Sequence, residues 1–428
     1  MDATGFKVIS CDISPDPGLE LFGRAGGMRI SQSLAVPLEA NILISRDAAG
    51  DPVYLIALDT LFAGQCLKDA LSEALFARGH LKIAENLVLV ASHTHSAPAL
   101  DNSKPRLGAM EPGYLEFVVG RISDALDTIQ ESGSQESQLY YARSACEGSV
   151  YRRKRAWARL PGQFGFHRQT IMAPNHDCEI NKTLTLICVG PVDAPLAVIW
   201  SWACHPVSEP DPNAISADFP GHMRQWLREK FGNPNLTVLF MPGFSGDIRP
   251  DSKAWLPRLS KLFRVPFTTV FAVPSQSALA RLNGDLQDAM QSALNRLRPL
   301  TDPGGRVIIK NDHLPLSEIG SFDLAVDHIP LVHLTIGGLE ILAVGAEVSN
   351  AYLLQLPKPP NGHCRIETGC ANHVFGYIPT QKQCLNGGYE GGGFLRKFSI
   401  SGSFHPASLH NMERKLKTLC ETADRKIF

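Results

Sequence analysis

The segment Leu87–Pro98 reads LVLVASHTHSAP, an apolar run followed by two histidines, His93 and His95. A short, continuous apolar run is typical of a strand buried in a parallel or mixed sheet. Open α/β sheets place their ligand sites at the carboxyl ends of such strands. The segment therefore predicts a buried strand that carries both histidines to a functional edge of the sheet.

Three further apolar runs also end at a polar residue that can bind a metal ion or transfer a proton. Taken singly, each is weak evidence, because His205 fits a core histidine, Asp247 a turn residue and Glu347 an acid at a helix N-terminus. Four strand ends that carry His, His, Asp and Glu together indicate one site. The runs are Leu196–Trp202 before His205, Leu236–Met241 before Asp247 and Leu339–Val344 before Glu347.

These strands belong to an alternating pattern of strands and helices. Apolar runs at Val53–Leu58 and Leu184–Val189 add two strands, and helical periodicity follows several of the runs. The pattern predicts an α/β fold with a layered mixed β-sheet, flanking helices and a metal site at the strand carboxyl ends. The clearest helices are expected over Gln65–Arg78, Gly113–Gln130, Gly221–Phe231 and Val348–Leu356.

The overall charge argues against two classes of protein. The chain has 428 residues, with 41 Lys and Arg against 42 Asp and Glu and a formal net charge of −1. Nucleic-acid proteins and polybasic membrane-surface binders need a basic face, which this balance does not indicate. Hydrophobic residues make up 44% and suffice for a large core. A small-molecule partner is therefore expected, and nothing in the sequence indicates the oligomeric state.

The N-terminus and the cysteines predict a cytoplasmic protein. Met1–Pro15 carries Asp2, Lys7 and Asp12 and has no long apolar core, unlike a signal peptide. The longest apolar stretches run to about ten residues, too short to cross a bilayer, so no transmembrane segment is expected. The 10 cysteines form no C-x-x-C pair, as expected for reduced and mostly buried thiols.

The His-x-His pair has two interpretations. Side chains alternate along an extended strand, so His93 and His95 would share one face and could both reach a metal ion. The same pair also occurs as ordinary polar surface. Two known metal motifs fit poorly, because Ser96–Pro98 replaces the Asp-His half of the metallo-β-lactamase motif and amidohydrolase barrels carry His-x-His on their first strand.

Six short motifs match one family in order and spacing. SHTHSAP (92–98) resembles Thr-His-Thr-His-Ser-Gly-Pro, ACHP (203–206) resembles Val-His-Pro, and GDIRP (246–250) resembles Gly-Asp-Val-Ser-Pro. GAE (345–347) resembles Pro-Gly-Glu, GYIPT (376–380) resembles His-Tyr-Ile-Thr-Thr, and YEGG (389–392) resembles Tyr-Glu-Gly/Ala. These motifs belong to the neutral (non-lysosomal) ceramidase family, which the chain resembles over most of its length.

The resemblance implies a zinc-dependent amidase with one Zn²⁺ per chain. Two imidazoles and a carboxylate are good zinc ligands and leave room for water, whose pKa zinc lowers to about 7. Arg152 is a rival for the role implied for its neighbour Arg153. The implied metal ligands are His93, His205, Glu347 and Tyr377, the implied catalytic residues are His95, Asp247, Arg153 and Tyr389, and the implied substrate-binding residue is Gly23.

The sequence departs from the family motif at Arg249, where the family has a serine. A serine acyl-enzyme is therefore excluded at this position, and attack by zinc-activated water is favoured. Arg249 is expected either to bind an anionic group of the substrate or to be an ordinary surface arginine or a salt-bridge partner of Asp247. Asp59, at the end of the Val53–Leu58 run, is expected either to orient a ligand histidine or to serve a structural role.

The spread of the implied ligands predicts the domain organisation. They run from His93 to Tyr377 and must meet at one zinc, so residues 1–428 are expected to form a single catalytic domain, with Asp251–Ala280 as an insertion or lid. The segment after Tyr377 is too short for the C-terminal immunoglobulin-like domain of the ceramidases. Because that domain and an export signal are absent, a soluble N-acyl compound is the expected substrate rather than a lipid-embedded ceramide.

The leading hypothesis is thus a zinc-dependent hydrolase that cleaves a C–N amide bond. Two alternatives stay open from the sequence. A metal-dependent esterase or deacetylase could use the same scaffold, since zinc hydroxide attacks esters and amides alike. A non-catalytic metal-binding homologue is the second alternative, and Arg249 is the residue that favours it.

Overall fold

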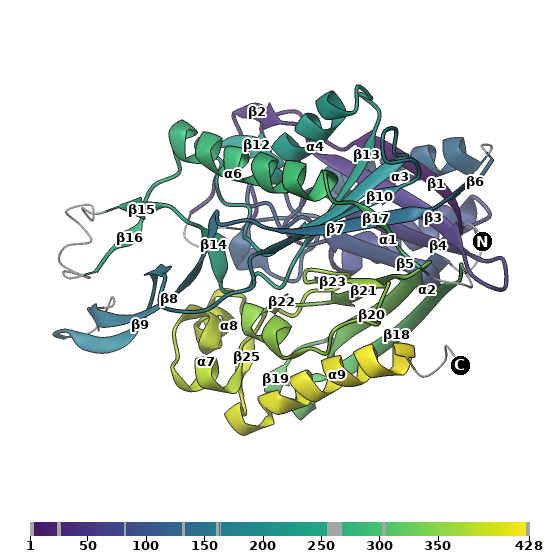
Figure 1. The fold of residues 1–428 in the computed structure, drawn as a ribbon. Helices are drawn as coiled ribbons and strands as arrows, with labels where there is room; N and C mark the ends of the chain where they lie inside the picture. The colour runs from purple at the N-terminus through teal and green to yellow at the C-terminus, as the bar shows by residue number, and fades with distance from the viewer. Residues whose placement is uncertain are drawn as a thin grey trace.

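Three β-sheets form the centre of the protein, and helices cover their outer sides (Figure 1). The computed structural model describes residues 4–23, 27–80, 83–130, 133–159, 162, 164–254, 268–301 and 305–424. The strand orders are β5-β4-β3-β1-β6 in the first sheet, β13-β11-β10-β7-β17 in the second and β18-β20-β21-β23 in the third. The mixed α/β fold expected from the sequence is confirmed.

Each central sheet combines parallel and antiparallel strands. The first contains β1 (Thr4–Asp12), β3 (Glu39–Arg46), β4 (Pro52–Leu58), β5 (Leu87–Ala91) and β6 (Gln135–Ser137). The second contains β7 (Leu139–Ala145), β10 (Thr183–Val189), β11 (Ala197–Trp202), β13 (Thr237–Pro242) and β17 (Arg298–Pro299). The third contains β18 (Val307–Pro315), β20 (His328–Ile336), β21 (Leu339–Val344) and β23 (Cys364–Thr368). Parallel pairs join β4 to β5, β11 to β13 and β21 to β23.

The continuous apolar runs arise because the strands are buried on both faces. Along β4, Val53 and Leu55 face a core shared by all three sheets, whereas Tyr54 and Ile56 face the core beneath the helices of the first sheet. A strand covered on both sides needs apolar residues at every position. All six predicted apolar runs are strands for this reason.

Each outer core is closed by its own helices. Helices α1 (Gly64–Ala77) and α3 (Pro112–Gln130) pack on the first sheet, and α4 (Asp218–Lys230) and α6 (Gln276–Leu294) pack on the second. Helix α9 (His410–Asp424) lies below the third sheet in Figure 1. The shorter helices are α2 (Ile83–Asn86), α7 (Gln381–Leu385), α8 (Phe394–Lys397), the 3-10 turns η1 (Pro105–Leu107), η2 (Leu316–Glu318), η3 (Asn350–Gln355) and η5 (Pro406–Leu409), and the π-turn η4 (Tyr389–Gly393).

Two helices differ from the sequence prediction. The helix expected over 348–356 is the 3-10 turn η3, because Val348 belongs to a strand and Pro357 leaves no room for further turns. Helix α6 was not predicted. The Ser275 side chain caps its first turn by accepting a hydrogen bond from the Ala278 backbone N–H. The buried face of the helix, which includes Leu282 and Leu286, packs on the second sheet.

The expected insertion over 251–280 lies partly outside the described residues, which omit 255–267. On its two sides, β15 (Lys253–Ala254) pairs with β16 (Val270–Phe271) in antiparallel fashion, and α6 begins within the expected range at Gln276. The lid role stays a prediction.

Small sheets surround the central ones and carry several site residues. The longest hairpin joins β8 (Ser149–Ala158) to β9 (His167–Asn175) and projects from the body at the left of Figure 1. Within the described residues, no helix is long and apolar enough to span a membrane. The other small-sheet strands are β2 (Ser33–Val36), β12 (Ala214–Ser216), β14 (Ile248–Pro250), β19 (Gly320–Asp323), β22 (Glu347–Val348), β24 (Tyr377–Ile378) and β25 (Ser401–Phe404).

Candidate metal centre

His93 lies two residues beyond the end of β5 in a backbone conformation that the sequence did not predict. Its φ is 69°, so the chain turns at His93 and is not the extended strand assumed for the His-x-His pair. Its N–H donates to the Thr60 carbonyl (2.9 Å), and its Nδ1 lies 3.0 Å from the Leu61 carbonyl. A hydrogen on Nδ1 satisfies that carbonyl and leaves the lone pair of Nε2 free to bind a metal ion.

His205 follows β11 and approaches His93 from the second sheet. Its N–H donates to the Ile248 carbonyl (3.3 Å), and its ring centroid lies 4.8 Å from that of His93. The loop behind it is held by Asp218, whose Oδ2 accepts hydrogen bonds from the backbone N–H groups of Ser208 (2.7 Å) and Glu209 (2.8 Å). Burial raises the pKa of Asp218 to about 6 against the opposing effect of its backbone hydrogen bonds.

Glu347 enters the site from β22, just beyond the end of β21. Its backbone pairs in parallel with Tyr377, and its N–H donates to the Gly376 carbonyl (2.8 Å). Gly246 passes so close that a Cβ there would lie 2.6 Å from the Glu347 carbonyl oxygen. The glycine of the Gly-Asp-Ile segment therefore allows the loop after β13 to pack directly against the strand that carries Glu347.

Three of these side chains converge on one point. The Nε2 atoms of His93 and His205 each lie 3.1 Å from Oε2 of Glu347, and all three side chains are buried. His93, His95 and His205 also bring one ring nitrogen each to within 4.8 Å of one another. Two imidazoles and a carboxylate that face each other in a buried site form a donor set suited to zinc, so the residues present fit such an ion.

The charges of Glu347 and His205 agree with this fit. Burial alone would raise the pKa of the Glu347 carboxyl, yet His93 and His205 hold it well below its ordinary value, so Glu347 is a carboxylate at neutral pH. Burial and the Arg152 guanidinium lower the pKa of His205 to about 3. For His93, burial alone would lower the pKa, but Cys370 and Glu347 raise it well above the ordinary value.

His95 stands beside these three residues and is oriented by Gly23. Its ring centroid lies 5.1 Å from that of His93, and its Nδ1 lies 2.9 Å from the Gly23 carbonyl. Gly23 has a φ of 108°, and a Cβ on it would lie 2.9 Å from Nδ1 of His95. Only glycine adopts this conformation at so close an approach without strain. The structure thus brings both predicted residues to the same place.

Tyr377 and Tyr389 extend the site along β24 and η4. Their rings are 5.3 Å apart, and Tyr377 is buried against Phe394 and Phe398. Burial and then the Glu347 charge raise the pKa of Tyr377 well above its ordinary value, with a hydrogen bond to Glu347 adding to the shift. The register of β22 and β24 therefore brings the fourth implied ligand next to Glu347.

The structure places Arg152, and not Arg153, against the metal-ligand candidates. Nη1 of Arg152 lies 3.0 Å from Nε2 of His205, and its guanidinium carbon lies 5.4 Å from the centre of the Tyr377 ring. Arg153 instead donates to Glu390 (2.8 Å) and to backbone carbonyls of Gln383 and Gly387.

A break in the strand register explains why the two arginines are hard to distinguish in the sequence. The pairing of β8 with β9 shifts between Tyr151 and Arg153, because β9 carries the extra residue of a β-bulge opposite Arg152, and the Arg152 and Arg153 side chains are both buried. Glu390 then binds the pair, accepting from Nε of Arg152 (2.6 Å) and Nη1 of Arg153 (2.8 Å). Glu390 lies beside Tyr389 in the YEGG motif, which was the one available signal for it.

Asp247 is buried, and both oxygens of its side chain accept hydrogen bonds from other groups of the protein. Its Oδ2 accepts from the Ser349 hydroxyl (2.6 Å) and from the Gln383 side chain (2.5 Å), and its Oδ1 accepts from the Asn350 N–H (2.8 Å). Burial raises the pKa of Asp247, against these hydrogen bonds. This carboxylate ties the loop after β13 to the segment that follows Glu347.

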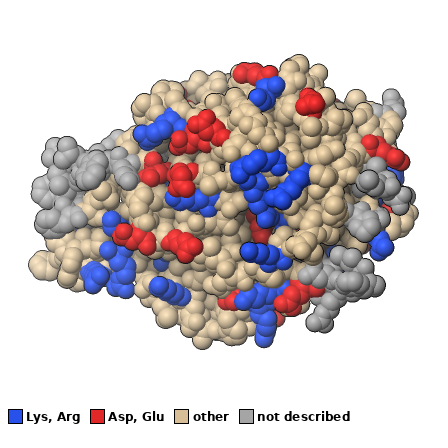
Figure 2. Space-filling view, in the orientation of Figure 1, with Lys and Arg blue, Asp and Glu red and all other residues tan. Residues whose placement is uncertain are grey.

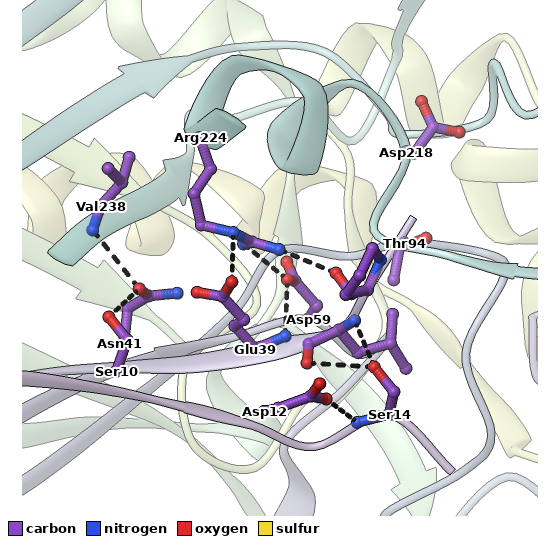
Figure 3. Close-up of polar contacts among 12 residues, drawn as sticks. Ser10, Asp12, Ser14, Glu39, Asn41, Asp59, Thr94, Asp218, Arg224 and Val238 are labelled. Carbon is purple, nitrogen blue, oxygen red and sulfur yellow. Dashed lines mark hydrogen bonds and ion pairs between the residues drawn. The ribbon is translucent and has the colours of Figure 1, made fainter. Parts of the chain in front are cut away.

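Asp59 serves a structural role away from the metal-ligand candidates. Its Oδ2 accepts from Arg224 Nη1 (2.8 Å) and from the Glu39 N–H (3.0 Å), and Arg224 also pairs with the Glu39 carboxylate (3.2 Å). Figure 3 shows Arg224 reaching down from its helix between the two acids. The strand-end Asp59 thus links α4 to the first sheet, and the structural alternative considered for it is the one observed.

Lys104 is a buried cation that the sequence did not reveal. Its Nζ donates to the Val374 carbonyl (2.5 Å) and the Ser103 hydroxyl (2.9 Å), and it lies 5.0 Å from the centre of the Phe62 ring. Phe62 in turn contacts the ring of His93, with centroids 5.3 Å apart. Burial lowers the pKa of Lys104. No motif surrounds this lysine, so only the fold could show its position.

Arg249 lies on β14 outside the group of converging side chains. Its guanidinium covers the Phe271 ring at 4.8 Å, and Nη1 contacts the Met172 sulfur at 3.4 Å. The carboxylate of Asp247 is bound by the groups named above, so the salt bridge considered for this pair is not the arrangement seen.

Comparisons with known proteins support the fold. No protein-family model matches the sequence, and no curated protein matches it. Neutral ceramidase from Pseudomonas aeruginosa superposes with a TM-score of 0.73 at 12% identity, over 98% of this chain and 74% of that chain. A ceramidase complexed with C2 superposes with a TM-score of 0.72 at 13% identity, over 99% of this chain and 76% of that chain. The chain therefore has the fold of neutral ceramidase, which confirms at the level of structure the resemblance carried by its motifs.

Proposed function

We propose that this chain is a metal-dependent hydrolase that cleaves the C–N amide bond of an N-acyl compound. The observation that carries the proposal is the meeting of His93, His205 and Glu347, with both Nε2 atoms 3.1 Å from one carboxylate oxygen. The similarity in fold to neutral ceramidase supports amide hydrolysis as the reaction. Because the converging residues come from all three sheets, one catalytic domain built from most of the chain is part of the proposal.

His93, His205 and Glu347 would hold one Zn²⁺ per chain, with Tyr377 as the fourth ligand beside Glu347. Bound by these residues, a zinc ion would supply a water activated at neutral pH and a Lewis acid for the scissile carbonyl. The Leu61 carbonyl fixes the His93 ring so that Nε2 faces the centre. Orientation of a ligand histidine by a backbone carbonyl is a common feature of zinc sites.

Arg152 would stabilise the negative charge that develops on the carbonyl oxygen. Glu390 fixes the Nε side of its guanidinium, while Nη1 faces His205 and the centre. A cationic donor that is held in place before the reaction costs little reorganisation in the transition state. Tyr389, whose ring packs against Tyr377, would contribute a second hydroxyl donor to the substrate.

His95 would carry the proton between water and the leaving amine. The Gly23 carbonyl binds a hydrogen on Nδ1 and leaves Nε2 to accept the proton. In this scheme Asp247 is a positioning residue, since Ser349, Gln383 and the Asn350 N–H already occupy its carboxylate.

The proposed function is tested by combining metal analysis with turnover. Wild-type protein should contain about one zinc per chain and hydrolyse short N-acyl amides, whereas a His205→Ala variant should lose both metal and activity. His313→Ala removes an exposed histidine and serves as the matched control. A folded, metal-free wild type without amidase activity would end the proposal.

A substrate panel separates the chemical classes. We propose that soluble N-acyl amides are better substrates than long-chain ceramide, and ester analogues of the same acyl groups report the esterase alternative. Efficient turnover of ceramide alone would contradict the proposed substrate class.

A further inference from the structure

The hairpin of β8 and β9 carries a local excess of positive charge that the net charge of the whole chain conceals. The segment 149–176, which spans both strands, contains no Asp or Glu. Arg152 and Arg153 are buried with Glu390, and the other basic residues are at least partly exposed. In Figure 2, blue side chains gather at the lower left, where Figure 1 places the hairpin. These exposed basic residues are Lys154, Arg155, Arg159 and Arg168.

Large aromatic side chains are exposed on the same hairpin. Phe164 is 100% exposed, Trp157 is 59% exposed and Phe166 is 42% exposed. Trp157 pairs with Arg168 across the two strands, so aromatic and basic residues stand side by side. A single exposed aromatic ring is ordinary, but three on one projecting hairpin indicate a surface that binds a partner.

Three of the exposed cations lack a partner of opposite charge. Within the described part of the chain, Lys154, Arg159 and Arg168 form no ion pair, and these three residues are called the cationic flank below. Arg155 differs, because its Nη1 donates to the Asn386 side chain at 3.1 Å. Positive charge that is not balanced locally attracts an anionic partner.

The order of residues along the hairpin separates aromatic from basic side chains. Phe164 and Phe166 lie in the turn, between the last residue of β8 and the first residue of β9, and form an apolar tip. Lys154 and Arg168 lie back along the strands, toward the body of the protein. The hairpin thus ends in aromatic rings and carries its positive charge behind them.

An anionic lipid bilayer fits this arrangement better than a nucleic acid does. A bilayer offers negative headgroups at its surface and an apolar interior beneath them, and aromatic rings are enriched at the boundary. A single strand of nucleic acid is bound instead in a basic groove that follows its backbone, with aromatic rings placed between the cations. An apolar tip with a cationic flank matches the layers of a bilayer.

We propose that the β8–β9 hairpin docks the protein on an anionic lipid bilayer, with the apolar tip in the interface and the cationic flank against the headgroups. The inference goes beyond the proposed function and does not depend on it, because this binding requires neither metal nor turnover. Strand β8 also carries Arg152, which lies about 17 Å along the strand from Trp157 at the usual rise per residue. Docking therefore holds the candidate metal centre close to the lipid surface.

Co-sedimentation with vesicles tests this binding. Wild-type protein should sediment with vesicles of phosphatidylglycerol and phosphatidylcholine in equal parts, and should not sediment with phosphatidylcholine alone. Raising the salt from about 0.1 M to about 1 M should release most of the protein, because the Debye length falls from about 10 Å to about 3 Å. Arg159→Gln/Arg168→Gln should bind about 30-fold more weakly, and Phe164→Ser about tenfold more weakly.

Matched variants control for general loss of charge or of apolar surface. Arg281→Gln/Arg306→Gln removes two exposed arginines elsewhere, and Phe76→Ser removes a 67% exposed phenylalanine of α1. Both should bind vesicles as the wild type does. Urea unfolding checks that every variant is folded. Tryptophan emission gives a second measurement, since it should shift to shorter wavelength on anionic vesicles and Trp157→Phe should lose this shift.

Three results would overturn the inference. The first is wild-type protein that neither sediments with anionic vesicles at low salt nor changes its emission. The second is an equal loss of binding in the hairpin variants and their matched controls. The third is tighter binding of the hairpin to a single-stranded oligouridine than to the vesicles, which would assign it to nucleic acid. None of these results bears on amide hydrolysis.

Discussion

Replacement of Gly23 by alanine tests whether the position of His95 matters to the reaction. Gly23 has a φ of 108°, which costs an L-residue about 1–2 kcal/mol or more. The new Cβ would lie 2.9 Å from Nδ1 of His95 and 3.2 Å from a methyl group of Leu61, so the His95 ring must move. Loss of the 2.9 Å hydrogen bond to the Gly23 carbonyl costs about another 1 kcal/mol.

The expected result for Gly23→Ala is a loss of about 2–3 kcal/mol in unfolding free energy, the sum of these two effects. Activity should fall by about 10²-fold, because sub-ångström to ångström displacements of a reacting group have effects of this size. Kinetics on an N-acyl amide measure the activity, and urea unfolding measures the stability.

Gly18→Ala is the matched control for backbone strain. Gly18 has a φ of 124°, yet a Cβ there would meet nothing within 4 Å. Both variants should be destabilised, but only Gly23→Ala should lose activity to the extent described. If Gly23→Ala keeps wild-type kcat/KM, or if the two variants lose activity equally, the role assigned to His95 is wrong.

Three further predictions concern the metal site and the groups around it. Glu347→Gln should abolish zinc binding in metal analysis, whereas Glu340→Gln, which changes another buried carboxylate beside histidines, should retain the zinc. Burial raises the pKa of Asp218 to about 6. Between pH 4 and 6 the folded chain therefore keeps the Asp218 proton, whereas the unfolded chain releases it, so the folded state loses stability as the pH rises through this window. The unfolding free energy of wild type minus that of Asp218→Asn should therefore fall by up to about 3 kcal/mol between pH 4 and 6, and a flat difference would contradict the assignment. Lys104→Met should cost about 2–4 kcal/mol because it leaves the Val374 carbonyl unpaired, whereas Lys417→Met, at a helix surface, should cost less than about 0.5 kcal/mol.

The strands could be predicted from the sequence because their two faces are both buried. Continuous apolar runs such as Val53–Leu58 favour buried strands at their length. Helix α6 and the β8–β9 hairpin were missed, since Pro-rich segments adjoin the former and the latter carries basic residues at buried positions. Burial of Arg152 and Arg153 depends on contacts with Glu390, which lies far away in the sequence.

The candidate site could be predicted in its residue types but not in its geometry. The strand ends identified His93, His205 and Glu347, and the fold brings them together. The positive φ of His93 and the bulge of β9 opposite Arg152 depend on packing between sheets, which has no local sequence signal. The same holds for the burial of Lys104.

Binding of one zinc ion by His93, His205 and Glu347 is tested most directly by a zinc-edge anomalous difference map from crystals of the active enzyme. We expect one peak per chain, bonded to Nε2 of His93, Nε2 of His205 and the carboxylate of Glu347. A peak elsewhere, or active crystals without any peak at these three residues, would contradict it.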